Sequence, residues 1–427
     1  MSKIKVVISC PIDTYSGYGA RSRDLVKALL KTGKYDVKIL SQRWGNTRFG
    51  YLNDHSESEL ASLIIPQLTA KPQVWMQVTV PNEFQPVGDY NIGVTAGIET
   101  TICDPSWIEG LNRMNLNLVS SNHAKETFER SKFNIEKDGK AQGQIELQKP
   151  VEVLFEGADL EKYFKTGTMA NMEINLDLNS IKESFCFLFV GHWLQGDFGQ
   201  DRKNVGYMIK AFLEVFKNKK NQPALILKTQ SANASILDRD NILRKIDDIR
   251  KTVKGTLPNI YLLHGEMDDS EINELYNHSK VKAMVSFTKG EGFGRPLLEF
   301  SLVNKPVIAS AWSGHVDFLD PEFSILVGGS LTNVHQSAVV KNMILAESQW
   351  FSTNDSQAGL ALKDVFDNYK KYAEQAKRQG YKSRTNFSFD KMVERLEEIF
   401  TTNLPKFAQE VKLELPKLSL PKLQKIE

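Results

Sequence analysis

Hydrophobic residues along this chain form two kinds of pattern that follow each other in turn. KVVIS (residues 5–9) is a short continuous apolar run, typical of a strand buried on both faces, and residues 24–33 have the period of an amphipathic helix that a glycine ends. Similar patterns predict strands at 36–41, 73–81, 90–98 and 117–121, and helices at 58–68, 106–114 and 123–131. Strands that alternate with helices predict a parallel sheet covered on both faces.

The same alternation begins again in the second half of the chain. A polar stretch at 135–150 is predicted to be an exposed loop, and we place the main domain boundary near 157–159. Strands are then predicted at 184–191, 223–229, 259–265, 281–287 and 306–310, and the chain is mostly helical after 356. The predicted fold class is α/β, with two tandem Rossmann-like, doubly wound domains, residues 1–156 and 157–387, that face each other across a cleft.

Composition and charge narrow the class of protein. The chain has 427 residues, 41% of them apolar, and a net charge of +2, so no global field favours nucleic acid or an anionic membrane. Cys10, Cys103 and Cys186 lack metal-ligand spacing and fit a reducing compartment. The start of the chain lacks a signal-peptide pattern, and no apolar run is long enough to span a membrane. We expect a cytoplasmic protein.

The last residues, 404–427, repeat a Leu-Pro-Lys theme in which prolines forbid a long helix. We predict a loose tail. The alternative is a docking segment for a partner protein or a membrane surface.

The segment TKGEGFGRPLLEFS contains the most specific chemistry. Glu291 and Glu299 lie eight positions apart, and a Gly-Phe-Gly turn between them precedes a helix with Pro296 in its first turn. The amides of a helix start bind diphosphate, a carboxylate one turn inside suits the two hydroxyls of a ribose, and a carboxylate in the turn suits a sugar. The spacing therefore fits a nucleotide sugar. The alternative is two solvated carboxylates at a helix N-terminus.

Four segments together resemble a known family. EGFGRPLLE with the following NKPVIAS closely resembles the E-x7-E signature of retaining GT-B glycosyltransferases, above all family 4 (glycosyltransferase group 1). YSGYGARSRDL resembles the family's N-terminal glycine loop, LFEGADLEKYF its interdomain segment, and FVGHW with DRKNVGYMIKAF its basic strand–loop–helix. The resemblance is good over roughly 180–320 and patchier over 1–160.

The resemblance implies a retaining glycosyltransferase that moves a hexosyl or pentosyl group from a nucleoside-diphosphate sugar to an acceptor hydroxyl. It implies no metal and no cofactor, and a C-terminal helix at about 388–403 that packs back on the first domain. The implied catalytic residues are Glu291, Lys203 and Arg202. The implied donor-binding residues are Glu299, Gly292, Phe293, Gly294, Gly17, Gly19, Arg295 and His192.

Other interpretations of these residues stay open. Arg202 and Lys203 can be a solvated surface pair, and Gly17 and Gly19 a structural strand-to-helix turn. His192 stands where the family has an arginine, so Arg202 or Arg295 has to supply that charge.

The acceptor is the least defined part of this prediction. Glu99 and His123 are candidates on the acceptor side, although His123 also fits a surface histidine at a helix start. Residues 42–51 (QRWGNTRFGY) are basic and aromatic, and either line an acceptor groove or form an ordinary loop. A glycan, a lipid-linked sugar, a protein hydroxyl and a modified DNA base all remain open as acceptors. A non-catalytic subunit that binds a nucleotide sugar or a glycan is the alternative function.

Overall fold

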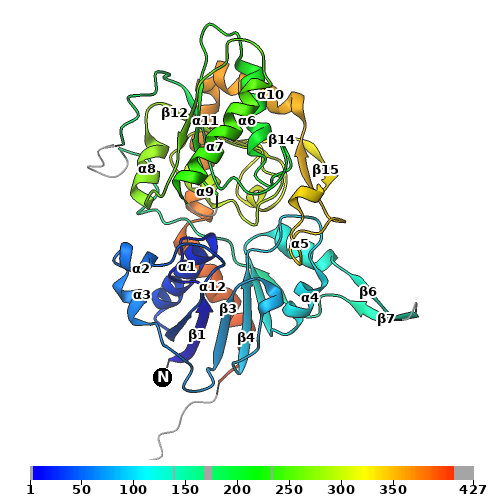
Figure 1. Cartoon of the computed structure of the whole chain (residues 1–427). Coiled ribbons are helices and arrows are strands. Elements are labelled where there is room, and N and C mark those ends of the chain that lie inside the picture. Colours follow the sequence, from blue (N-terminus) through cyan, green and yellow to red (C-terminus); the bar gives the residue numbers. More distant parts are fainter. Residues whose placement is uncertain (1–2, 138–139, 168–175, 232–233, 408–427) are drawn as a thin grey trace, which may run out of the picture.

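The computed structural model describes residues 3–137, 140–167, 176–231 and 234–407 and contains two α/β domains, one above the other in Figure 1. The first sheet is parallel throughout. In spatial order its strands are β2 (Tyr35–Ser41), β1 (Ile4–Cys10), β3 (Val74–Val78), β4 (Tyr90–Thr95), β5 (Leu116–Val119) and β8 (Val151–Val153). Its helices are α1 (Gly17–Thr32), α2 (Tyr51–Asp54), α3 (Ser58–Ser62), α4 (Pro105–Asn112) and α5 (Asn122–Arg130).

The second sheet is also parallel throughout. Its strands, in spatial order, are β11 (Ile260–Leu263), β10 (Ala224–Lys228), β9 (Cys186–Val190), β12 (Val281–Ser286), β13 (Val307–Ser310) and β14 (Ile325–Val327). Its helices are α6 (Val205–Phe216), α7 (Ile236–Lys251), α8 (Asp269–Asn277), α9 (Arg295–Ser301), α10 (Asp355–Asp367) and α11 (Tyr369–Asn386). This architecture confirms the predicted α/β fold class with two Rossmann-like domains.

The burial of α6 shows why these elements form. Val205, Met208, Ile209, Phe212 and Phe216 are all buried and recur at helical spacing, so one apolar stripe of the helix packs on the sheet. The strands beside it are continuous apolar runs because helices cover both of their faces.

The chain passes between the domains twice at one place. The backbone N–H of Ala158 donates to the Phe387 carbonyl (2.9 Å), and the N–H of Phe389 donates to the Ala158 carbonyl (2.8 Å). After this crossing, α12 (Phe389–Asn403) returns to the first domain, where Met392 and Phe400 join the core that contains α1 and β1. Figure 1 shows α12 beside α1 in the lower domain.

Two hairpins lie outside the predicted pattern. β6 (Phe133–Lys137) and β7 (Lys140–Ile145) pair antiparallel where the sequence predicted an exposed loop, so that prediction was wrong. The hairpin projects away from its domain (Figure 1). β15 (Gly329–Asn333) and β16 (Gln349–Thr353) form the second hairpin.

The second hairpin reaches the first domain. The N–H of Thr101 donates to the Gln349 carbonyl (2.9 Å), and the indole N–H of Trp107 donates to the Asn342 carbonyl (2.9 Å). The hairpin and the segment between its strands therefore connect the domains at a second place.

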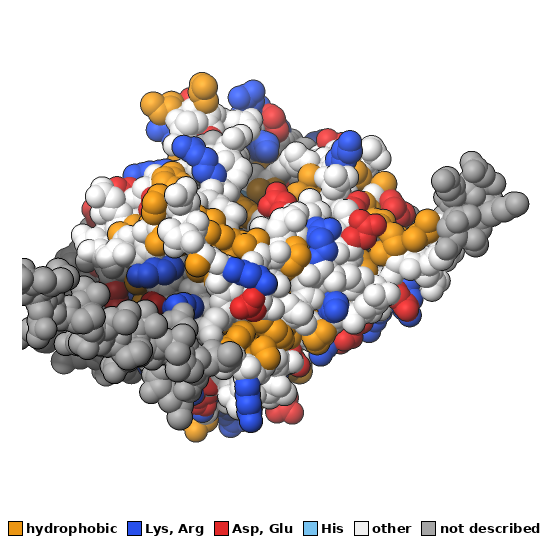
Figure 2. All heavy atoms as spheres, turned by 90° about the horizontal axis from the view of Figure 1, so that it is seen from below, with side chains coloured by type: hydrophobic (Ala, Val, Ile, Leu, Met, Phe, Trp, Pro, Cys, Tyr) orange, Lys and Arg blue, Asp and Glu red, His pale blue; other side chains and the backbone are white. Residues whose placement is uncertain are grey.

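The surface agrees with the small net charge. On the face seen from below, the described Lys and Arg side chains lie among acidic and hydrophobic ones rather than in one stripe (Figure 2). The described cysteines are free and buried, and no helix in the described ranges is long and apolar enough to cross a membrane. The predicted tail lies mostly outside the described residues, which end at 407.

Candidate active site

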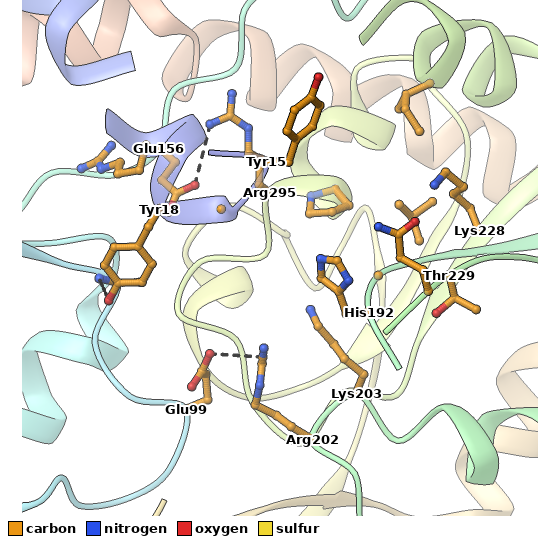
Figure 3. Close-up of a pocket in the computed structure, with 18 of the residues that line it drawn as sticks. Tyr15, Tyr18, Glu99, Glu156, His192, Arg202, Lys203, Lys228, Thr229 and Arg295 are labelled. Atoms are coloured by element: carbon orange, nitrogen blue, oxygen red, sulfur yellow. Dashed lines mark hydrogen bonds and ion pairs between the residues drawn. The ribbon is translucent and has the colours of Figure 1, made fainter. Parts of the chain in front are cut away.

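A cavity of about 470 Å³ lies between the two domains. The first domain contributes the end of β3, the segments after β1, β4 and β8, and the start of α1. The second contributes the ends of β9 and β10, the residues before α6, and the start of α9. This is the position at the carboxyl ends of the strands where ligands bind in such folds. The charged side chains that line it are Arg21, Glu99, Glu156, Arg202, Lys203, Lys228, Glu266 and Arg295, most of which Figure 3 labels.

Two cations that line one end of the cavity are paired with Glu291, a buried carboxylate that is not part of the lining. The Lys203 ammonium donates to both oxygens of Glu291, at 2.6 and 2.8 Å. The Arg202 guanidinium donates to the Gly290 carbonyl at 2.9 Å and lies 3.4 Å from Glu291. It also forms an ion pair with Glu99 of the first domain at 3.2 Å, drawn as a dashed line in Figure 3. Arg202 and Lys203 are therefore interior cations at a domain interface, and the alternative of a solvated surface pair was wrong.

Electrostatics keep this cluster charged. Burial by itself would raise the pKa of Glu291, but Lys203 and Arg202 overcome that effect and lower it to about 2. Burial lowers the pKa of Lys203, and the Glu291 carboxylate opposes the change. An anion that entered beside Lys203 and Arg202 would compete with Glu291 for the same N–H groups.

The glycine turn before α9 packs directly on the first domain. A Cβ at Gly290 would lie 2.2 Å from the Glu99 carbonyl oxygen, and one at Gly292 would lie 2.7 Å from the Ala96 carbonyl oxygen. Gly294 has a φ of 95°, which allows the chain to enter α9. The glycines permit backbone-to-backbone contact across the interface, which explains why this turn has so few side chains.

This arrangement differs in part from the predicted cradle for phosphates. Phe293 points into the core of the second domain, with its ring 5.0 Å from that of Phe318. The cavity lining takes Arg295 and Pro296 from this segment rather than Gly292, Phe293 or Gly294, and the predicted phosphate contacts of that turn stay a prediction. From the other domain Gly17 lines the cavity, whereas Gly19 packs against Thr14 behind it.

Replacement of Gly290 is expected to loosen the interface. Gly290→Ala would place a methyl group 2.2 Å from a backbone oxygen, so the domains must separate locally. We expect a loss of about 1–3 kcal/mol in the free energy of unfolding, measured by denaturant titration. Gly17→Ala is the control, because its Cβ would meet nothing within 4 Å. Equal stability of the two variants would contradict this account of the turn.

Glu299 lies on α9 in a second charged cluster. Its carboxylate accepts from Arg295 Nε at 2.9 Å, and Arg295 also bonds Asp24 of α1, which makes a second ion pair between the domains. Glu156 lies 3.9 Å from the same guanidinium. Burial raises the pKa of Glu299 to about 7, against the effect of Arg295.

The two predicted histidines, His192 and His123, differ in their position relative to the cavity. His192 lines the cavity with part of its side chain exposed, and partial desolvation together with the nearby Lys203 lowers its pKa, so it does not replace the arginine of the resembling family. His123, at the start of α5, is half-buried. Burial lowers its pKa to about 4, and its ring lies 4.5 Å from Trp312 at the domain interface, beside the cavity rather than in its lining.

The basic and aromatic segment 42–51 lies behind one wall of the cavity. The Trp44 ring stacks on Tyr18 with centroids 3.9 Å apart, and the Arg48 guanidinium lies 4.6 Å from the centre of the Tyr15 ring. Tyr15 and Tyr18 both line the cavity. The segment therefore supports an aromatic wall contributed by the first domain.

Sequence reasoning missed several residues of the lining. They are Tyr15, Tyr18, Arg21, Lys228, Gln230, Glu156 and Glu266. Lys228 and Gln230 could have been found from the sequence. Polar residues at the end of a buried strand, or directly after it, lie at the edge of such a sheet where ligands bind. Among the described residues no group of three or more His, Cys, Asp or Glu side chains has a metal-binding arrangement.

Comparisons with known proteins agree with this geometry. Residues 199–350, which include both cations and both glutamates, match the family model described as glycosyl transferases group 1. No curated protein matches the chain by sequence.

Solved structures match over nearly the whole chain. A glycosyltransferase from Rickettsia africae has a TM-score of 0.61 at 12% identity, covering 95% of this chain and 99% of that one. Sucrose-phosphate synthase from Thermosynechococcus elongatus has a TM-score of 0.60 at 12% identity, covering 94% and 99%. Anabaena Alr3699/HepE, in complex with UDP and glucose, has a TM-score of 0.58 at 12% identity, covering 93% and 100%. At this identity the likeness establishes the fold, which is GT-B.

Proposed function

We propose that this protein is a glycosyltransferase that uses a nucleoside-diphosphate sugar as its donor. The observation that carries the proposal is the pair Arg202 and Lys203, which line a cavity between two Rossmann-like domains and are ion-paired with the buried Glu291. These residues lie within the segment that matches the glycosyltransferase family model. The UDP-bound structure of Alr3699/HepE, which has the same fold, supports a nucleotide sugar as the ligand class.

The diphosphate of the donor is assigned to Lys203 and Arg202. Negative charge grows on the diphosphate as the bond to the sugar breaks, and fixed cations in an enclosed site stabilise that charge. In the free protein the Glu291 carboxylate lies 2.6 Å from the Lys203 ammonium. The diphosphate of the donor would replace this carboxylate beside Lys203, and Glu291 could then contact the donor sugar. Arg295 and Pro296, at the start of α9, line the cavity. Glu299, one turn further along the same helix, is assigned to the ribose hydroxyls.

We further propose that the transfer retains the configuration of the sugar and needs no bound metal or cofactor. The bond from the anomeric carbon to the diphosphate oxygen breaks, and the acceptor hydroxyl oxygen bonds to that carbon on the same face. The acceptor's proton passes to the departing diphosphate oxygen, so no side-chain nucleophile is required. The two cations and the helix start would stabilise the negative charge on the departing diphosphate, as a bound metal ion otherwise would.

The acceptor is assigned to the side of the first domain. Glu99 lies at the cation end of the cavity, and its ion pair with Arg202 at 3.2 Å directs its carboxylate toward the reacting groups. Trp44 and Tyr18 form a stacked aromatic surface of the kind that contacts sugar rings. Together they favour a carbohydrate acceptor over a DNA base. On the face drawn in Figure 2, the described residues form no basic stripe.

The direct test is release of nucleoside diphosphate from a panel of nucleotide sugars. We expect one donor to be hydrolysed slowly without acceptor, and the reaction to be lost in Lys203→Ala and Glu299→Ala. Lys251→Ala is the control, because that side chain is 67% exposed on α7. Absence of donor binding by the parent protein would favour a different ligand for the cavity. Proton NMR of the product's anomeric signal tests retention.

The raised pKa of Glu299 gives a pH dependence. The pKa of the Glu299 carboxyl is 4.5 as its ordinary value and about 7 in the folded protein. Protonated Glu299 therefore stabilises the folded state. That contribution is present below about pH 4.5 and is lost as the pH rises through about 7, an effect of about 3 kcal/mol. The stability of Glu299→Gln relative to the parent should therefore increase from pH 5 to pH 8 in urea titrations. A constant difference would contradict the raised pKa.

A further inference from the structure

The end of the cavity away from Glu99 is polar and takes no part in the mechanism above. Lys228 is the last residue of β10, Gln230 follows two positions later, and Glu266 lies in the loop between β11 and α8. All three line the cavity. Figure 3 shows Lys228 and Thr229 on the opposite side from Glu99, with His192 and Lys203 between.

These side chains are fixed by bonds to their neighbours. The amide nitrogen of Gln230 donates to a Glu266 oxygen at 3.0 Å, and Gln230 itself is 7% exposed. The Lys228 ammonium donates to the Gly265 carbonyl, which uses one of its three N–H groups. An ammonium with free donors and a carboxylate with free acceptor sites therefore line the same end of the cavity.

A nucleotide in this cavity has to run along the edge of the second sheet. The strand order β11-β10-β9-β12 places the ends of β9 and β10 next to each other, with Lys203 beside the first and Lys228 at the second. If Lys203 and Arg202 hold the diphosphate, the base lies toward Lys228 and Glu266. Tyr15, Ile272 and Pro296 also line the cavity and supply apolar surface for a flat ring.

We propose that Glu266, together with Lys228, selects guanine as the base of the nucleotide donor, an inference that rests on the proposed function. Guanine presents two adjacent donors, N1–H and the 2-amino group, beside the acceptor O6. A carboxylate accepts from both donors with its two oxygens, and an ammonium donates to O6. The three groups of the base thus find matching partners on two side chains.

The other bases match less well. Adenine presents one amino donor beside an acceptor nitrogen, so it engages only one carboxylate oxygen. Uracil presents a single N–H between two carbonyl oxygens, and a carboxylate placed to accept from that N–H has its second oxygen near a carbonyl. The expected order of affinity is GDP, then ADP, then UDP.

The test is calorimetric titration of the intact protein with GDP, ADP and UDP. We expect GDP to bind about tenfold or more tightly than UDP, and Glu266→Gln to lose that preference. Glu266 is exposed, so its replacement is not expected to disturb folding. Glu322→Gln, another exposed glutamate of the same domain, is the control and should keep the preference.

The possible results separate this inference from the proposed function. Binding of UDP or ADP as tight as that of GDP, or an unchanged preference in Glu266→Gln, overturns the assignment of guanine and leaves the transferase proposal intact. Absence of binding by all three nucleotides overturns both.

Discussion

Lys203→Ala is expected to lower the rate of sugar transfer by about 10²- to 10³-fold, because the departing diphosphate loses a fixed cation in an enclosed site. Arg202 remains 3.4 Å from Glu291, so that carboxylate keeps a partner and the variant should fold. The measurement is kcat and KM with the donor that the panel identifies. Lys203→Arg keeps the charge and should recover part of the rate.

The loss should appear in kcat as well as in KM, since charge on the leaving group is greater in the transition state than in the bound donor. Lys251→Ala, which changes an exposed lysine outside the cavity lining, should behave as the parent. A parent-like kcat in Lys203→Ala would remove this lysine from the catalytic machinery.

Glu291→Ala is expected to have opposite effects on binding and on catalysis. Removal of the carboxylate leaves Lys203 with no counter-charge at 2.6 Å and should cost about 3–5 kcal/mol in the free energy of unfolding. A nucleoside diphosphate then no longer competes with Glu291, so it should bind more tightly and restore part of the lost stability. Transfer should be lost, because the proposed contact with the donor sugar is gone.

The measurement for Glu291→Ala is thermal unfolding with and without nucleoside diphosphate, beside a single-turnover assay. Glu322→Ala removes an exposed carboxylate of the same domain and is the matched control. A variant as stable as the parent, or one that nucleotide stabilises less than the parent, would show that Glu291 does not compete with the diphosphate.

The fold was predictable because its buried parallel strands are short continuous apolar runs. The run at 184–191 became β9 (Cys186–Val190), for example, and the helical period after 204 became α6. The β6–β7 hairpin was not predictable on this basis, since its residues are mostly polar and Ile135 is 42% exposed. An exposed ribbon needs no apolar face, so its sequence resembles a loop.

The candidate site was predictable only in part. The spacing of Glu291 and Glu299, and the adjacent Arg202 and Lys203, are local patterns that a sequence displays directly. The ion pair of Glu99 with Arg202 and that of Asp24 with Arg295 join residues of different domains, which no local pattern reveals. The role of Gly290 was missed for the same reason, because it depends on contact with the Glu99 backbone.

The proposed function places a nucleoside diphosphate in the interdomain cavity, with its phosphates at Lys203 and Arg202. A crystal structure of the protein with the tightest-binding nucleoside diphosphate tests this most directly. Phosphate oxygens are expected within about 3 Å of the Lys203 ammonium, in the place of Glu291. The base is expected between Tyr15 and Glu266. A nucleotide bound outside this cavity, or bound with its phosphates at Lys228, would contradict the account.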